Sequence, residues 1–118
     1  MNFKSILLGA ALAVSPVFGF ADSNIKMVVG TYTDAGSQGI YSFFFDQSTG
    51  KASGITSLKV DNPSYFTFSK DGRNIYAVSE KNNATAVLNS IGYDPVNGTF
   101  AFKNSQLTHG GDPCYVST

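Results

Sequence analysis

A run of aromatic residues that ends in an Asp-x-x-x-Gly turn occurs twice in the sequence and decides the fold. Residues 41–50 read YSFFFDQSTG and residues 89–98 read NSIGYDPVNG, which places the two aspartates 48 residues apart (94 − 46 = 48). Such runs favour β-strands, and the glycine that closes each turn tolerates the positive φ of a tight hairpin. A repeat of about 50 residues with four strands per repeat is typical of the blades of a β-propeller.

Short apolar segments between turn residues account for the rest of the chain after residue 25, and no segment has a sustained helical period. Residues 41–45 are apolar on both faces of their strand, which suits a sheet covered on both sides. The fold class predicted is all-β, a β-propeller. The strands that we expect are Lys26–Thr33, Gly39–Asp46, Gly54–Val60, Ser64–Ser69, Asn74–Glu80, Ala86–Tyr93, Thr99–Leu107 and Cys114–Ser117.

The order of these strands predicts about two four-stranded blades. With Ser64–Ser69 as an innermost strand, the next three strands complete one blade, and Cys114–Ser117 begins another. The three strands before Ser64 are then strands two to four of a preceding blade. Two blades are too few to close a ring of roughly four to eight, and they leave strand edges unpaired. We therefore expect residues 22–118 to be the N-terminal part of a longer propeller; a small β-meander complete in itself is the alternative.

The composition excludes several classes of protein. Eight Lys and Arg balance eight Asp and Glu, which gives no electrostatic signature of nucleic-acid binding. One cysteine excludes a disulfide within the chain and a cysteine-cluster metal site. At 42% hydrophobic and 14% charged residues, the chain is too apolar to be a disordered tail.

Residues 1–21 have the pattern of a secretory signal peptide. One lysine, Lys4, precedes an apolar stretch, and Gly19 and Ala21 supply small residues at the −3 and −1 positions of a cleavage site. An uncleaved membrane anchor is the alternative, but it needs about 20 apolar residues, and this stretch is shorter and is interrupted by Pro16. We expect an exported protein, periplasmic or secreted, with no membrane association after cleavage.

Several further motifs follow one another over residues 27–117. They are VGTYT at 29–33, GIY at 39–41 leading to FD at 45–46 and TG at 49–50, NPSY at 62–65, DGR at 71–73 with IYAVSE at 75–80, and GGDPCYVS at 110–117. Taken in order, they resemble the seven-bladed lactonase family that includes bacterial 6-phosphogluconolactonase and the fungal carboxy-muconate cyclases. The resemblance implies a full-length relative about three times longer.

The resemblance also implies an activity, the hydrolysis of a lactone ring in carbohydrate metabolism. Hydrolysis needs an activated water, donors for the carbonyl oxygen and a proton for the departing alkoxide. It requires no metal, and we expect neither a metal nor a cofactor. The expected partner is a small-molecule lactone. A non-catalytic exported propeller used for binding is the alternative, because fold does not fix function.

Candidate site residues follow from blade geometry. Neighbouring strands of a blade alternate in direction, so the loop before strand one and the loop after strand two lie on the same face of a propeller. That face holds Asn62 and Ser64 before an innermost strand, Glu80 after a second strand, and Tyr32 and Thr33 at the equivalent end of the first blade. The resemblance implies that Glu80 is a catalytic or substrate-binding carboxylate, and we expect it to be the catalytic residue. The position of the other four residues on the same face makes them candidates for substrate binding.

Each of these residues also has a structural interpretation. Glu80 can order the turn that follows it, and Asn62 can form an Asx-turn that positions Pro63. Tyr32 and Thr33 can serve packing alone.

Overall fold

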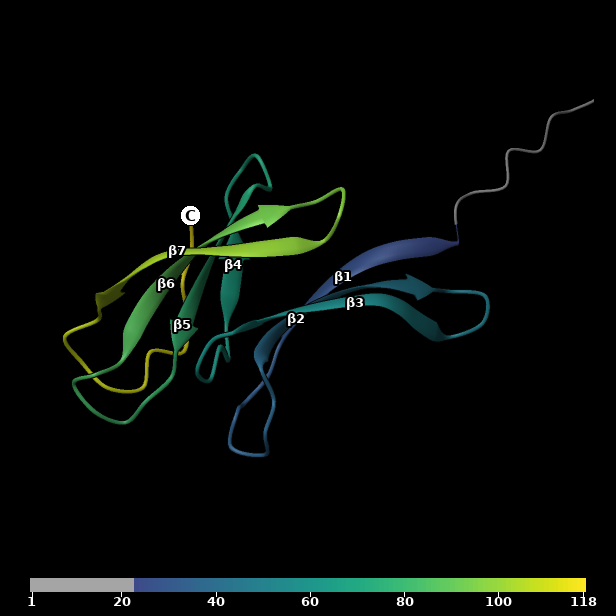
Figure 1. The fold of residues 1–118 in the computed structure, drawn as a ribbon. Coiled ribbons are helices and arrows are strands. Elements are labelled where there is room, and N and C mark those ends of the chain that lie inside the picture. Colours follow the sequence, from purple (N-terminus) through teal and green to yellow (C-terminus); the bar gives the residue numbers. More distant parts are fainter. Residues whose placement is uncertain (1–22) are drawn as a thin grey trace, which may run out of the picture.

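The computed structural model describes residues 23–118, which form two antiparallel sheets and no helix (Figure 1). The first sheet, blade one, has the order β1-β2-β3, and the second, blade two, has the order β4-β5-β6-β7. The strands are β1 (Asn24–Gly30), β2 (Gly39–Asp46), β3 (Lys51–Lys59), β4 (Phe66–Phe68), β5 (Asn74–Ser79), β6 (Val87–Asp94) and β7 (Thr99–Leu107). This all-β architecture of two partial propeller blades confirms the predicted fold class. No helix in this part of the chain is long and apolar enough to cross a bilayer. The predicted signal peptide lies outside the described residues.

The strand register shows that the two blades are structural repeats. Ser42 pairs with Thr56 in blade one, and Ser90 pairs with Asn104 in blade two. Lys26 pairs with Phe44, and Asn74 pairs with Gly92. Each residue of the second pair lies 48 positions after its counterpart, so three strands repeat without insertion. The register shift also recurs, next to Ser42 in one blade and next to Ser90 in the other.

The hydrophobic core lies between the two blades. Ile40 and Val60 of the first blade pack with side chains of the second, and all of them are at most 8% exposed. The residues contributed by blade two are Ile75, Ala77, Ile91 and Tyr93. Because each sheet buries one face on the other, neither blade has an independent core of this size.

The turn between β6 and β7, Asp94–Gly98, docks on blade one and is called here the second turn. The Lys26 ammonium donates hydrogen bonds to the carbonyl oxygens of Pro95 (2.7 Å) and Val96, and the Thr56 hydroxyl donates to that of Gly98. The hydroxyls of Ser42 and Tyr93 are hydrogen-bonded at 3.1 Å. This polar contact fixes the register between the blades beside the apolar core.

The predicted strand Cys114–Ser117 is wrong, because no strand follows Leu107 in the described part of the chain. An extended segment becomes a strand by pairing its backbone, and residues 113–118 instead lie against β4 through individual contacts. The Thr118 hydroxyl donates to the Phe68 carbonyl oxygen at 3.0 Å, and the Tyr65 and Tyr115 rings lie 4.9 Å apart. Cys114, expected inside an innermost strand, is consequently exposed.

Candidate functional site

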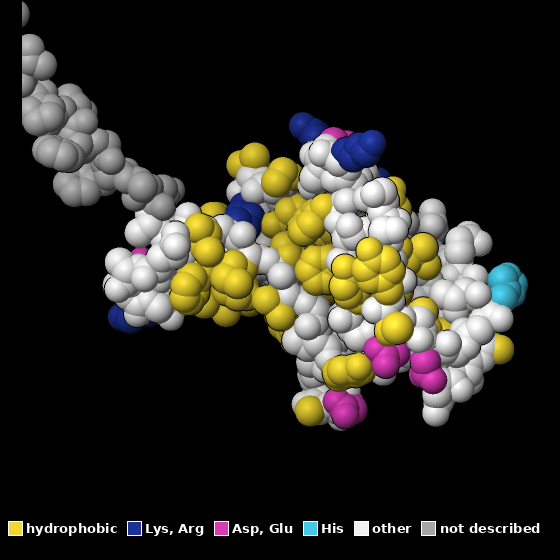
Figure 2. All heavy atoms as spheres, turned by 180° about the vertical axis from the view of Figure 1, so that it is seen from behind, with side chains coloured by type: hydrophobic (Ala, Val, Ile, Leu, Met, Phe, Trp, Pro, Cys, Tyr) yellow, Lys and Arg dark blue, Asp and Glu magenta, His cyan; other side chains and the backbone are white. Residues whose placement is uncertain are grey.

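The five predicted site residues lie together where the two blades meet. Tyr32 and Thr33 lie in the loop after β1, which ends at Gly30 rather than at the predicted Thr33. Glu80 follows β5, and Asn62 and Ser64 precede β4. We call this end of the blades the site edge. Acidic side chains gather along the lower edge of the molecule in Figure 2, where the loops after β1 and β5 lie in Figure 1. The prediction that alternating strand directions bring these residues to one end of the sheets agrees with this arrangement.

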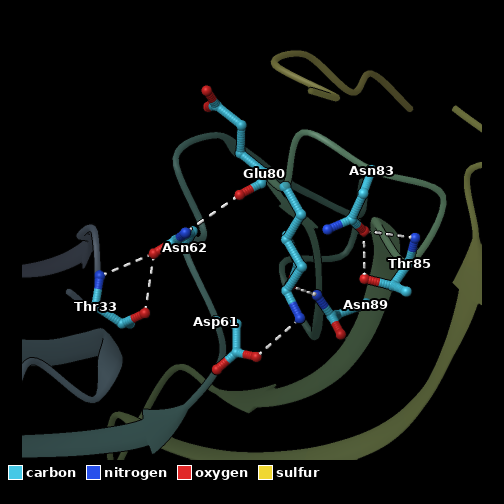
Figure 3. A network of polar contacts seen from close by, with 9 residues as sticks. Thr33, Asp61, Asn62, Glu80, Asn83, Thr85 and Asn89 are labelled. Atoms are coloured by element: carbon cyan, nitrogen blue, oxygen red, sulfur yellow. Dashed lines mark hydrogen bonds and ion pairs between the residues drawn. The ribbon is translucent and has the colours of Figure 1, made fainter. Parts of the chain in front are cut away.

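Asn62 joins the two blades at this edge (Figure 3). Its side-chain oxygen accepts hydrogen bonds from the backbone N–H and the hydroxyl of Thr33, both at 2.9 Å. Its side-chain amide donates to the Glu80 carbonyl oxygen at 3.2 Å, and its own carbonyl accepts from the Glu80 N–H at 3.0 Å. These contacts use one N–H of the Asn62 side-chain amide and leave the other for a substrate. Substrate binding by Asn62 stays a prediction, whereas its hydrogen bonds show that it positions Thr33 and Glu80.

The backbone conformation of Asn62 is part of this arrangement. Its φ is 40°, in the left-handed region that asparagine tolerates better than most residues. This left-handed conformation lets the Asn62 carbonyl oxygen accept hydrogen bonds from the N–H groups of both Ser64 (2.8 Å) and Glu80. The geometry therefore requires asparagine for its conformation as well as for its amide.

Tyr32 and Glu80 are repeat-related residues that contact each other across the blade interface. The Tyr32 hydroxyl donates to a Glu80 carboxylate oxygen at 3.1 Å, and 56% of Tyr32 is exposed. The hydrogen bond to Glu80 and its negative charge raise the pKa of Tyr32 above the ordinary value of 10.0. In Figure 3 the Glu80 side chain extends away from Asn62. A carboxylate held at one oxygen and open at the other can accept a proton from water.

Ser64 contributes a buried hydroxyl beside this pair. Its Oγ has no hydrogen-bond partner of good geometry among the described residues. The same hydroxyl lowers the pKa of Tyr32 by less than Glu80 raises it, which places Ser64 next to the phenol. Because this hydroxyl is buried, the neighbour that it can interact with in this structure is the Tyr32 phenol, and its predicted role in substrate binding stays a prediction.

Three charged residues flank the cluster. The Lys81 ammonium pairs with the Asp61 carboxylate at 3.1 Å, and the Lys81 carbonyl accepts from the Asp112 N–H at 2.7 Å. The charge of Asp112 also contributes to the raised pKa of Tyr32. Asp112 was not among the predicted site residues, although a signal for it was present: Asp112-Pro113 repeats Asn62-Pro63, and both Asn62 and Asp112 have positive φ.

A cavity lies away from the site edge. It is an open hollow of about 540 Å³ at the other end of blade two, with Arg73, Tyr93 and Val96 in its wall. It contains none of the predicted site residues. Among residues 23–118 no three His, Cys, Asp or Glu side chains are grouped as metal ligands.

The chain matches the model of the family described as "Lactonase, 7-bladed beta-propeller" over residues 26–118. The chain belongs to this family. The 6-phosphogluconolactonase of Bacillus subtilis (strain 168) is 36% identical over 90 residues, which are 75% of this chain and 26% of that protein.

Solved structures of lactonase relatives agree with the fold. A candidate 6-phosphogluconolactonase of Bacteroides uniformis is 46% identical and superposes with a TM-score of 0.75, covering 81% of this chain and 28% of its own. The periplasmic gluconolactonase PpgL of Pseudomonas aeruginosa is 31% identical with a TM-score of 0.65, covering 76% of this chain and 26% of its own. The chain thus spans about a quarter of the length of the relatives it matches.

Proposed function

We propose that this chain supplies part of a site that hydrolyses sugar lactones, with Glu80 as the general base. The observation that carries the proposal is the contact between Tyr32 and Glu80, which fixes one carboxylate oxygen at the edge where two blades of a lactonase-family propeller meet. The names of the relatives, 6-phosphogluconolactonase and gluconolactonase, support this reaction class.

The chemistry assigns one role to each group. The Glu80 carboxylate accepts a proton from water while the water oxygen bonds to the lactone carbonyl carbon. The ring C–O bond then breaks, the carbonyl re-forms as a carboxyl group, and the departing alkoxide takes the proton back from Glu80. The Tyr32 hydroxyl holds the carboxylate in place, and the buried Ser64 hydroxyl lies beside that phenol.

The charges at the site edge favour a lactone without a phosphate group. The Lys81 ammonium is already paired with Asp61, while Glu80 and Asp112 add negative charge nearby. A dianionic phosphate placed here meets repulsion with little compensation. A neutral aldonolactone is not repelled by these charges, so we propose neutral aldonolactones as the substrate class.

Export is part of the same proposal. The signal-like pattern of residues 1–21 supports it, and the relative from Pseudomonas aeruginosa is a periplasmic gluconolactonase. Sugar phosphates are mostly retained inside cells, so export and an unphosphorylated substrate are consistent with each other.

A chimera tests the proposal in a complete ring. The matched 90-residue segment of the Bacillus subtilis enzyme is replaced by the corresponding segment of this chain, and hydrolysis of D-glucono-1,5-lactone and of its 6-phosphate is measured. We expect an active chimera in which Glu80→Gln lowers kcat by about 10²–10⁴-fold, the usual contribution of a general base. We also expect the ratio of the two kcat/KM values to shift toward the unphosphorylated lactone.

A matched control distinguishes the loss of a catalytic carboxylate from the loss of a negative charge elsewhere in the chain. Asp71→Asn removes a carboxylate from the turn at the opposite end of β5, so kcat should stay within twofold. A folded chimera in which Glu80→Gln is as active as its parent would refute the role of Glu80. A folded chimera that binds gluconolactone without hydrolysing it would favour the non-catalytic binding alternative.

A further inference from the structure

An ion pair between Asp61 and Lys81 spans the junction of the two blades. The Lys81 ammonium and the Asp61 carboxylate lie 3.1 Å apart, and they form the only ion pair among residues 23–118. Asp61 directly precedes Asn62, and Lys81 directly follows Glu80. The pair therefore sits on the two segments that the hydrogen bonds of Asn62 hold together, which fixes its backbone relative to Glu80.

The repeat shows that the Lys81 side chain is not needed to join the segments around it. Lys81 follows Thr33 by 48 residues, the spacing of the repeat, and each of the two contacts a residue that precedes a proline. Thr33 donates to the Asn62 side chain, while the Lys81 carbonyl oxygen accepts from the Asp112 N–H at 2.7 Å. Because Lys81 makes this contact with its backbone, its ammonium is available for another role.

Lys81 is also the lysine best placed to meet a charged substrate at the site edge. It lies in the loop between β5 and β6, directly beside the proposed base. Lys59, the other lysine at this end of the described strands, ends β3, which is the strand of blade one farthest from β1. A phosphate on a lactone held at Glu80 would therefore meet Lys81 before it meets Lys59.

In the structure this ammonium is matched by a carboxylate and is held away from the base. Figure 3 shows the Glu80 side chain extending away from Asn62 and from Asp61, the residue with which Lys81 pairs. Lys81 therefore does not neutralise Glu80. A phosphate monoester, which carries about two negative charges near pH 7, has to displace Asp61 before it can use this ammonium.

The ion pair is exposed enough to be opened. The side chains of Lys81 and Asp61 are 33% and 54% exposed. Exposed ion pairs contribute little to folding, so removal of the Asp61 carboxylate should leave the blades intact. The flexible four-carbon stem of lysine then lets the ammonium turn toward a bound anion. Asp61 thus acts on a substrate through Lys81 and not by direct contact.

We propose that Asp61 sets the substrate specificity of the site edge by holding the Lys81 ammonium. With Asp61 in place the site edge takes a neutral aldonolactone, and without it Lys81 binds the phosphate of a phosphorylated aldonolactone. This inference rests on the proposed function, because it takes the lactone to bind beside Glu80. It adds that one carboxylate outside the reacting groups decides between the two substrate classes.

Unreactive sugars test the proposal without requiring catalysis. D-glucose and D-glucose 6-phosphate resemble the two lactones but cannot be hydrolysed, and ligand-observed NMR measures their dissociation constants in the chimera described above. We expect Asp61→Asn to tighten binding of glucose 6-phosphate about tenfold, as a new charge-assisted hydrogen bond does, and to leave binding of glucose within about twofold. The ratio of kcat/KM values for the two lactones should shift in the same direction.

Two further variants identify the cause of the shift. The double variant Asp61→Asn, Lys81→Gln has the net charge of the parent chimera but lacks the ammonium, so the gain should disappear. Asp71→Asn removes a carboxylate from the turn at the opposite end of β5 and should leave the ratio of the two affinities unchanged. Asp61→Ser takes the place of Asp61→Asn if circular dichroism shows that the latter does not fold.

Three results would each overturn the proposal: an unchanged affinity for glucose 6-phosphate in Asp61→Asn, a gain that survives in the double variant, or an equal gain in Asp71→Asn. Failure of the proposed function gives a different result. A Glu80→Gln chimera that keeps its full kcat refutes the base, whereas the ratio of the two sugar affinities still reports on Asp61.

Discussion

Asn62 is the residue on which the site edge depends most. It contributes two accepted hydrogen bonds, one donated hydrogen bond and a positive φ that few other residues tolerate. Through these it connects Thr33 of blade one to Glu80 of blade two. Its effect on Glu80 is therefore one of position.

We predict a graded response to substitution of Asn62. Asn62→Asp keeps the acceptor for Thr33 and loses the donor to Glu80, which costs about 1 kcal/mol of unfolding free energy. Asn62→Gly keeps the conformation but loses all three side-chain hydrogen bonds, at about 2–3 kcal/mol. Asn62→Ala adds the cost of φ 40° for an L-residue, about 1 kcal/mol more. Urea unfolding of the chain measures the series. If Asn62→Ala is more stable than Asn62→Gly, the backbone part of this explanation is wrong.

The second prediction concerns the phenol of Tyr32. Its pKa is raised mainly because Glu80 accepts its hydrogen bond and carries a negative charge. Glu80→Gln removes the charge, so the Tyr32 pKa should fall toward 10.0, and Tyr32 should ionise at lower pH than in the unmodified chain. Because the raised pKa favours the neutral phenol in the folded state, this contribution to stability is present below pH 10 and is lost as pH rises through the folded pKa.

NMR titration of the Tyr32 ring carbon measures this shift. Tyr41 is the internal control, because the Ser37 hydroxyl and the Gln38 N–H lower its pKa and neither interacts with Glu80. An unchanged Tyr32 titration in Glu80→Gln would show that the two side chains are not in contact in solution.

The sequence was sufficient to bring the site residues together but not to give their contacts. Tyr32 and Glu80 follow the repeat-related strands β1 and β5, so the strand directions alone place them at one edge. The hydrogen bonds of Asn62 depend on its positive φ, which no residue pattern around Asn-Pro specifies. Asp112 was not predicted as a site residue although Asp112-Pro113 repeats Asn62-Pro63, and its positive φ, like that of Asn62, was seen only in the structure.

At the scale of elements, the strand bounds predicted most accurately are those next to a turn with a distinctive sequence. β2 and β7 have the predicted bounds, because a turn with a distinctive sequence precedes or follows each of them. β3 begins at Lys51 rather than Gly54, since the bulge places Gly54 at a φ of 60° and lets pairing with β2 continue to the turn. β4 is shorter than predicted, and Cys114–Ser117 is not a strand, because pairing depends on a neighbour that local sequence does not reveal.

The third prediction uses the two turns as a matched pair. Gly98→Asn and Gly50→Asn introduce the same side chain at the same φ of 70°. At residue 98 the new side chain collides with Ser42 and separates the blades, at about 1–3 kcal/mol of unfolding free energy. At residue 50 an added Cβ has no neighbour within 4 Å, so the change should be about 0.5 kcal/mol or less. The urea midpoints of the two variants, measured at low protein concentration, compare their stabilities. Equal losses of unfolding free energy would contradict the docking of the second turn on blade one.

At the scale of the whole molecule, the chain is two repeating units whose shared core holds them together. Its core residues come from both blades, and its site residues come from the ends of strands in both. A binding site at the centre of a propeller is assembled from many blades, and this chain covers 26–28% of the relatives' length. The proposed function therefore assigns Glu80 and its positioning residues to this chain, and it assigns the remaining groups of the site to the further blades that the relatives have.

The last prediction follows from that geometry: the 118-residue chain alone does not hydrolyse lactones measurably. Glu80 supplies a base, but a base without donors for the developing oxyanion leaves out the interaction that usually contributes most to such a reaction. The assay follows proton release from D-glucono-1,5-lactone with the purified chain, and the rate of spontaneous hydrolysis in the same buffer is the baseline. Glu80→Gln is the control, because trace activity from a contaminating enzyme survives that substitution. Turnover above baseline that disappears in Glu80→Gln would show that two blades suffice for catalysis, and the whole-ring interpretation of the site would then be wrong.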